Sequence, residues 1–133
     1  AIRNNNDIPV VLKKEKNIKE DLIENINNLK NKYKSIAVIT KNDKEANKIY
    51  NLLKNDLDIS LIKTDSNIFD RNLVVVPSYV SKGLEFDSVI IYTEKDNKYT
   101  DDEKYLYYVS CTRCQHELVI YNQEDWLTNK NRL

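Results

Sequence analysis

The hydrophobic positions of this chain fall into short apolar runs that alternate with amphipathic segments. The apolar runs are rich in β-branched residues and span 8–12, 35–40, 59–62, 73–76, 89–92 and 118–121. Runs of this length and composition predict six β-strands. Between them, apolar residues recur with a period near 3.6 over 18–33 and 43–55, which predicts two helices. A third helix of about a dozen residues is predicted to open at the acidic residues 101–103.

The order of these elements predicts an α/β domain with three layers. Strands that alternate with helices and are apolar throughout are typical of a mostly parallel sheet that is covered on both faces. Two helix starts also have capping residues, since Asn17 precedes Glu20 by three positions and Asn42 or Asp43 precedes the second helix. In such sheets, ligands often bind beyond the carboxyl ends of the strands.

The length and charge of the chain limit the number of domains and the kinds of partner that it can have. A chain of 133 residues is one domain of ordinary size, residues 1–133. Its 21 basic and 21 acidic residues cancel, so any contact with nucleic acid depends on local charge. No apolar run approaches the roughly 18 residues of a membrane helix, and no secretory segment is evident, so we expect a cytoplasmic protein that contacts no membrane. Because the chain begins at Ala1, we expect it to be part of a longer polypeptide.

Scarce residue types exclude several kinds of site. The chain has one Gly, one His and two Cys. A P-loop needs two glycines and a dinucleotide fingerprint needs three, so the chain alone cannot cradle nucleotide phosphates in either way. The H-E-x-x-H metal site needs two histidines and the four-cysteine zinc site needs four cysteines, so both are excluded. The EF-hand loop is excluded because Gly83 is not preceded by the spaced acidic residues that it requires.

Two segments carry candidate chemistry. The first is Ser-Lys-Gly-Leu-Glu-Phe-Asp at 81–87, which contains the single glycine, Gly83. That glycine is expected where φ is positive or where a ligand approaches the backbone. The alternative is an ordinary turn with a solvated Lys82 and a buried Phe86, and the residues alone leave both interpretations open.

The second segment is Tyr-Val-Ser-Cys-Thr-Arg-Cys at 108–114. Arginine is scarce, with four against seventeen lysines, and Arg113 lies among small and apolar residues. A planar guanidinium can hold phosphate oxygens with two hydrogen bonds at once. The alternative is an arginine at a helix end that pairs with Glu117.

Together, these segments resemble two motifs of superfamily 1 helicases of the UvrD/Rep/PcrA type. Motif V is resembled by V-V-V-P-S-Y-V-S-K-G-L-E-F-D-S-V-I-I, and motif VI by D-D-E-K-Y-L-Y-Y-V-S-C-T-R-C-Q-H-E-L-V-I-Y. Upstream, motif IV is resembled by I-A-V-I-T-K-N. The resemblance spans nearly the whole chain and implies the second RecA-like, P-loop NTPase-like motor domain, of the 2A type.

The resemblance implies a role for individual residues in ATP binding. Arg113 matches the arginine finger that reaches the γ-phosphate, and Thr112 matches a residue that supports it. Glu85 matches the carboxylate that binds the ribose, and Gly83 matches the glycine that lets the loop approach. Lys41 matches the motif IV position at the ATP site. The N-terminal RecA-like domain of the same polypeptide would hold the ATP phosphates and Mg²⁺.

The resemblance also implies a nucleic-acid contact at Ser78 and Tyr79, with single-stranded or duplex DNA as the partner. Pro77 and Tyr79 replace the usual Thr and His, and Lys41 replaces an Arg. Only about ten residues join the third and fourth strands, which leaves no room for the large 2B insertion. This compactness is similar to the HelD-type branch, whose members act on RNA polymerase. The alternative function is therefore a protein-docking module that does not catalyse ATP hydrolysis and binds RNA polymerase.

The pair Cys111 and Cys114, with His116 nearby, has the spacing of a redox pair or half of a zinc site. A fourth zinc ligand has no evident source, so the sequence favours buried, reduced thiols and no metal site. His116, expected at the junction of the last helix and strand, is assigned no catalytic role.

Overall fold

The computed structural model describes residues 8–14, 16–63 and 72–123. Each predicted strand and helix is present in it, with different bounds at several ends. The strands are β1 (Val10–Lys13), β2 (Ile36–Thr40), β3 (Ser60–Leu61), β4 (Leu73–Pro77), β5 (Phe86–Tyr92) and β6 (Cys114–Tyr121). The α-helices are α1 (Ile18–Lys30), α2 (Asp43–Leu53) and α3 (Lys104–Cys111), and the 3₁₀ turns are η2 (Ser78–Val80) and η3 (Asp101–Glu103).

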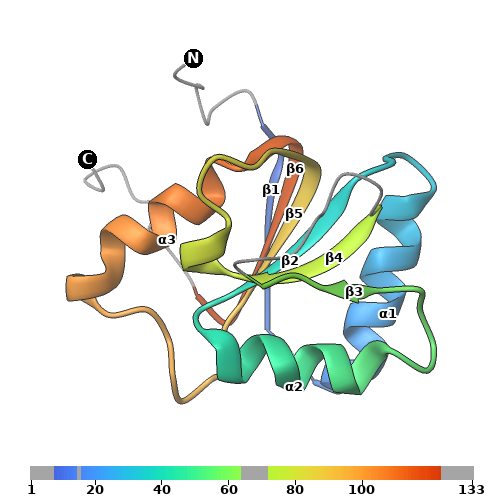
Figure 1. Cartoon of the computed structure of the whole chain (residues 1–133), viewed down its shortest axis with the longest axis horizontal. Helices are drawn as coiled ribbons and strands as arrows, with labels where there is room; N and C mark the ends of the chain where they lie inside the picture. The colour runs from blue at the N-terminus through green and yellow to red at the C-terminus, as the bar shows by residue number, and fades with distance from the viewer. Residues whose placement is uncertain (1–7, 15, 64–71, 124–133) are drawn as a thin grey trace.

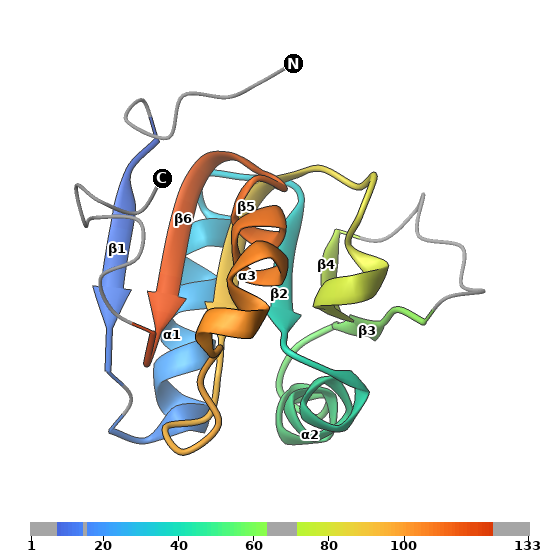
Figure 2. The ribbon, with the colours of Figure 1, turned by 90° about the vertical axis from the view of Figure 1, so that its left-hand side faces the viewer.

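The strands form one sheet in the order β1-β6-β5-β2-β4-β3, and every described pair is parallel. Helices α1 and α2 cover one face, while α3 and η2 cover the other (Figures 1 and 2). This arrangement confirms the three-layer α/β fold. It also explains the continuous apolar runs, because all five residues of β2 are buried between two helical layers.

Alternate strand residues divide the interior into two cores. In β2, Ile36 and Val38 pack with the residues of α1 and α2, while Ala37 and Ile39 pack on the α3 side. The centre of the sheet has no exposed positions, since Val38 pairs with Ile90 of β5 and both are 0% exposed. Because every described pair is parallel, the carboxyl ends of all six strands lie along one edge of the sheet, here called the carboxyl edge. Their first residues lie along the opposite edge, here called the amino edge.

Both predicted helix caps are found. The Asn17 Oδ1 atom accepts a hydrogen bond of 3.1 Å from the backbone N–H of Glu20. At α2 the cap is Asn42 rather than Asp43, and its Oδ1 accepts from the N–H of Glu45 at 3.0 Å. Replacing such a cap with Ala costs about 1 kcal/mol of stability, so the two caps fix the helix starts.

Strands β5 and β6 begin earlier than the apolar runs indicate. Phe86 pairs with Cys114, and the backbone N–H of Phe86 donates to the Arg113 carbonyl at 2.9 Å. The added residues are a mixture of buried, half-buried and exposed positions with several polar side chains, so they lack the continuous apolar character used to predict strands. As a result, the expected placement of His116 at a helix-to-strand junction is wrong, and the residue lies within β6. Over the described residues, no helix has the length and apolar character to cross a membrane.

Candidate functional site

The predicted site residues divide between the two edges of the sheet. Glu85 directly precedes β5, and Arg113 directly precedes β6. These strands are neighbours, and the hydrogen bond from the Phe86 N–H to the Arg113 carbonyl joins their first residues. The structure therefore brings Glu85 and Arg113 side by side at the amino edge. Glu85 is exposed and Arg113 is half-buried, so neither is enclosed in the core.

Neutral oxygen atoms hold the Arg113 guanidinium. Its Nε donates to the Val109 carbonyl at 3.1 Å, and its Nη2 donates to Thr112 Oγ1 at 2.9 Å. The Thr112 hydroxyl in turn donates to the same carbonyl at 2.7 Å. Within the described part of the chain, Arg113 makes no ion pair with a carboxylate. These two hydrogen bonds therefore fix the position of the guanidinium without neutralising its charge.

The alternative partner of Arg113, Glu117, is engaged elsewhere. Its Oε1 accepts from Lys32 Nζ at 2.9 Å and from the Tyr33 hydroxyl at 3.1 Å. The hydrogen bond and charge of Glu117 raise the pKa of Lys32. The ordinary pairing of Arg113 with Glu117 is therefore absent from the structure.

The sequence analysis did not predict Gln115, whose side-chain amide donates to Glu85 Oε1. Gln115 lies two residues after Arg113, at a half-buried position of β6. A strand predicted to start at residue 114 would have placed it beside Glu85. This contact orients one oxygen of an otherwise exposed carboxylate.

Gly83 has a φ of +80°, as expected of the single glycine in the chain. A Cβ atom added there would meet nothing within 4 Å. The glycine therefore serves the left-handed backbone conformation, not close packing inside the domain. The same loop presents Lys82, whose Nζ lies 5.9 Å from the centre of the exposed Tyr105 ring.

Lys41 lies at the other edge, directly after β2. Its strand neighbour Thr40 pairs with Tyr92, which comes seven residues after Glu85. At about 3.3 Å per strand residue, this register places Lys41 roughly 25 Å from Glu85. The structure therefore does not bring Lys41 together with the other residues expected at the ATP site.

The Lys41 side chain is occupied by contacts inside the domain. Its Nζ lies 2.8 Å from Glu103 Oε1 and donates to Asn97 Oδ1 at 3.2 Å and to the Lys98 carbonyl at 3.1 Å. Only 10% of the side chain is exposed. Burial by itself would raise the pKa of Glu103, but hydrogen bonds from Lys41 and Thr100 outweigh it and lower that pKa. Lys41 thus joins β2 to the segment before α3.

The two residues expected to contact nucleic acid differ in exposure. Ser78 is buried, and its hydroxyl donates to the Lys41 carbonyl at 3.0 Å. Tyr79 is 47% exposed, and its hydroxyl lies 3.0 Å from both carboxylate oxygens of Asp43. Ser78 therefore stabilises the turn, and the Tyr79 side chain is the one that reaches solvent.

Cys111 and Cys114 are both free and buried, as the sequence predicts for structural thiols. The Cys114 Sγ donates to the Glu117 carbonyl at 2.9 Å. Burial raises the pKa of Cys111, which keeps that thiol protonated. Among residues 8–14, 16–63 and 72–123, no three His, Cys, Asp or Glu side chains are grouped to hold a metal ion.

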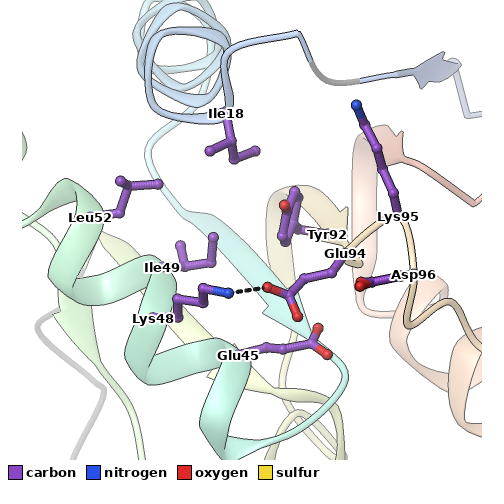
Figure 3. A pocket seen from close by; sticks show the side chains of 9 residues that line it. All are labelled: Ile18, Glu45, Lys48, Ile49, Leu52, Tyr92, Glu94, Lys95 and Asp96. Carbon is purple, nitrogen blue, oxygen red and sulfur yellow. Dashed lines mark hydrogen bonds and ion pairs between the residues drawn. The ribbon is translucent and has the colours of Figure 1, made fainter.

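A pocket of about 480 Å³ lies at the carboxyl edge, far from Glu85 and Arg113. Figure 3 shows Glu45 and Lys48 extending into it from α2, and Glu94 and Asp96 from the segment after β5. Glu45 is only 3% exposed, and desolvation raises its pKa. The sequence held one signal for it, since residues 45, 49 and 53 share the buried face of the helix.

The fold of the chain is similar to that of solved protein structures. No family model and no curated protein matches the sequence. Among solved structures, the chain is similar to the C-terminal domain of a possible DNA helicase from Lactobacillus plantarum WCFS1. The TM-score is 0.69 at 29% identity, over 88% of this chain and 74% of that one.

It is also similar to the C-terminal domain of the DEAD-box protein Dbp5. Here the TM-score is 0.64 at 15% identity, over 92% of this chain and 80% of that one. The chain therefore has the RecA-like fold of helicase C-terminal domains, as the sequence predicts.

Proposed function

We propose that this chain is the C-terminal motor domain of an ATP-dependent superfamily 1 DNA helicase or translocase. The observation that carries the proposal is the pair formed by Glu85 and Arg113 at the accessible amino edge. A carboxylate accepts hydrogen bonds from ribose hydroxyls, and a guanidinium binds phosphate oxygens. The likeness to the domain of a possible DNA helicase supports the same function.

In this function the domain completes a nucleotide site rather than forming one alone. The single glycine of the chain cannot build a phosphate cradle. The N-terminal RecA-like domain of the parent protein therefore holds the ATP phosphates and Mg²⁺. This domain contributes Glu85 to the ribose and Arg113 to the γ-phosphate, while Gly83 gives the loop its turn. An isolated domain would then bind ATP weakly.

Arg113 acts by neutralising charge that develops as the phosphoryl group is transferred. Val109 and Thr112 hold its guanidinium through two hydrogen bonds, so little orientation remains to be gained in the reaction. A positioned arginine of this kind contributes about 10³ to 10⁵ in rate. Thr112 is a positioning residue, because it acts through Arg113.

The nucleic-acid contact belongs to the opposite edge. Tyr79 offers an exposed aromatic ring on which a DNA base can stack. Lys41 forms an ion pair with Glu103, so it is assigned neither to the ATP site nor to the nucleic-acid contact. No observation on the described residues favours the alternative of a module that docks on RNA polymerase.

The proposal is tested by Arg113→Ala in the protein that contains both motor domains. We expect the ATPase rate to fall by about a thousandfold or more, while ATP affinity stays within a few-fold. Arg113→Lys keeps the charge but loses the two-pronged geometry, and we expect it to recover little activity. Lys44→Ala, which removes an exposed cation of α2, is the matched control and should leave the rate unchanged. Equal loss of binding and hydrolysis in Arg113→Ala would contradict the finger role.

A further inference from the structure

The pocket at the carboxyl edge contains a buried carboxylate that is only half satisfied. Glu45 Oε2 accepts a hydrogen bond of 2.7 Å from the Asn97 side-chain amide. Its Oε1 is buried and has no hydrogen-bond partner among the described residues. Such an oxygen is costly to bury, and a donor that reached it would offset that cost.

A second carboxylate lies beside the first. Figure 3 shows Glu94 next to Glu45 at the same end of the pocket, with Asp96 close by. The Lys48 ammonium pairs with Glu94. Together with desolvation, the charge of Glu94 raises the pKa of Glu45, against opposing contributions from Lys41 and Lys48 that are each smaller. A single cation placed between Glu45 and Glu94 would compensate both.

We propose that this pocket binds an organic cation, an alkylammonium or alkylguanidinium, with its charged group between Glu45 and Glu94. The apolar wall, formed by Ile49 and Leu52 of α2 with Tyr92 of β5, suits an aliphatic stem. The volume of about 480 Å³ is within the range of small-ligand sites. A bare metal ion would leave this wall unused.

The Lys48 side chain explains how the cation enters. It is 66% exposed, and an exposed ion pair opens at little cost. When Lys48 moves into solvent, the ligand takes its place on Glu94 and also reaches the deeper Glu45. Lys48 is thus an internal competitor for the ligand.

This site is independent of the proposed ATP site. It lies beside Tyr92, the last residue of β5, while Glu85 lies before the first residue of the same strand. Loss of the pocket would therefore leave the amino edge intact.

The test is a nuclear magnetic resonance titration of the 133-residue chain with n-butylguanidinium. The control ligand is n-butylurea, which has nearly the same shape and no charge. We expect n-butylguanidinium to shift the Asn97 side-chain amide and the amides of α2 in a saturable manner. The urea should cause no saturable shift. Equal shifts with both compounds, or no shift at Asn97 with either, would overturn the proposal.

Four variants sharpen the result. Glu45→Gln and Glu94→Gln should each weaken binding about tenfold or more, because a charge-assisted hydrogen bond becomes a neutral one. Lys48→Gln should strengthen binding several-fold, since the competing ammonium is gone. Glu24→Gln makes the same change on the exposed face of α1 and should have no effect.

Thermal unfolding and spectral dispersion check that each variant is folded. If Glu45→Gln does not fold, Glu94→Gln and Lys48→Gln still decide the matter. Unchanged affinity in both of these would overturn the proposal.

Two further ligands distinguish a free amine from a peptide side chain. Putrescine represents a free diamine, and N-acetyl-arginine N-methylamide represents an arginine within a peptide. Tighter binding of either supports the site and identifies the source of the cation. Failure of both to compete with n-butylguanidinium would count against it.

Discussion

A substitution at Lys41, a residue predicted to bind ATP, tests whether this residue has a structural role instead. The change is Lys41→Met, which keeps the aliphatic stem and removes the ammonium. In the folded chain this ammonium contacts Glu103, Asn97 and the Lys98 carbonyl, all within 3.2 Å. These contacts tie the end of β2 to the segment that leads into α3.

The expected loss follows from these contacts. Breaking a fully buried ion pair costs about 3 to 5 kcal/mol, and a hydrogen bond to a charged group contributes about 1.5 to 3 kcal/mol. The Lys41 side chain is 10% exposed, but that of Glu103 is 33% exposed and can regain water. We therefore expect the free energy of unfolding to fall by about 2 kcal/mol.

Urea denaturation between pH 3 and pH 7 measures this loss and its pH dependence. The pKa of Glu103 is lowered in the folded chain from its ordinary value of 4.5. Its stabilising effect is therefore present above that ordinary value and is lost as the pH falls through the lower, folded value. In Lys41→Met this acid-dependent part should shrink, as it should in Glu103→Gln.

Two results would refute the reasoning about Lys41. One is a loss below about 0.5 kcal/mol with an unchanged pH profile, which is the range of an ordinary surface substitution. The other is a large loss of ATP affinity in the two-domain protein with full stability, which would return Lys41 to the nucleotide site.

Three further predictions concern residues at the amino and carboxyl edges of the sheet. Gly83→Ala should lower the free energy of unfolding by about 1 to 2 kcal/mol in urea denaturation, because the φ of Gly83 is +80°, and Gly83→Asn should lower it by less. Equal stability of the original chain and both variants would contradict the backbone argument. The purified 133-residue chain should show no ATP turnover in a phosphate-release assay, and robust turnover would disprove the shared site. In the two-domain protein, Tyr79→Ala should weaken single-stranded DNA binding about tenfold in fluorescence anisotropy. Tyr79→Phe keeps the ring and loses only the bond to Asp43, so an equal loss would exclude stacking.

Much of the fold follows from local pattern. A strand buried on both faces reads as a nearly continuous apolar run, as Ile36–Ile39 of β2 do, and an amphipathic helix repeats its apolar residues about every 3.6 positions. Asn17 and Asn42 are visible as caps for the same reason, since capping depends on residues only three positions apart. Such signals need no knowledge of the rest of the chain.

Local patterns did not predict the first residues of β5 and β6. Their first residues mix buried with half-buried or exposed positions, and a strand of that kind is recognisable only when its partner is known. Gln115 was missed on that account. Glu45 was missed as a pocket residue because its surroundings come from α2 and from the segment after β5, which are far apart in sequence.

The sequence by itself determined the elements, the parallel sheet and the residue types that can contact phosphate and ribose, because these depend on spacing over a few positions. The tertiary structure decided which of those residues share an edge. The strand order puts β5 beside β6, so Glu85 lies beside Arg113. The opposite position of Lys41 follows from strand direction alone, because Lys41 comes after β2 and Glu85 comes before the parallel strand β5. Strand order is set by the packing of segments that are distant in the chain, and no local pattern contains it.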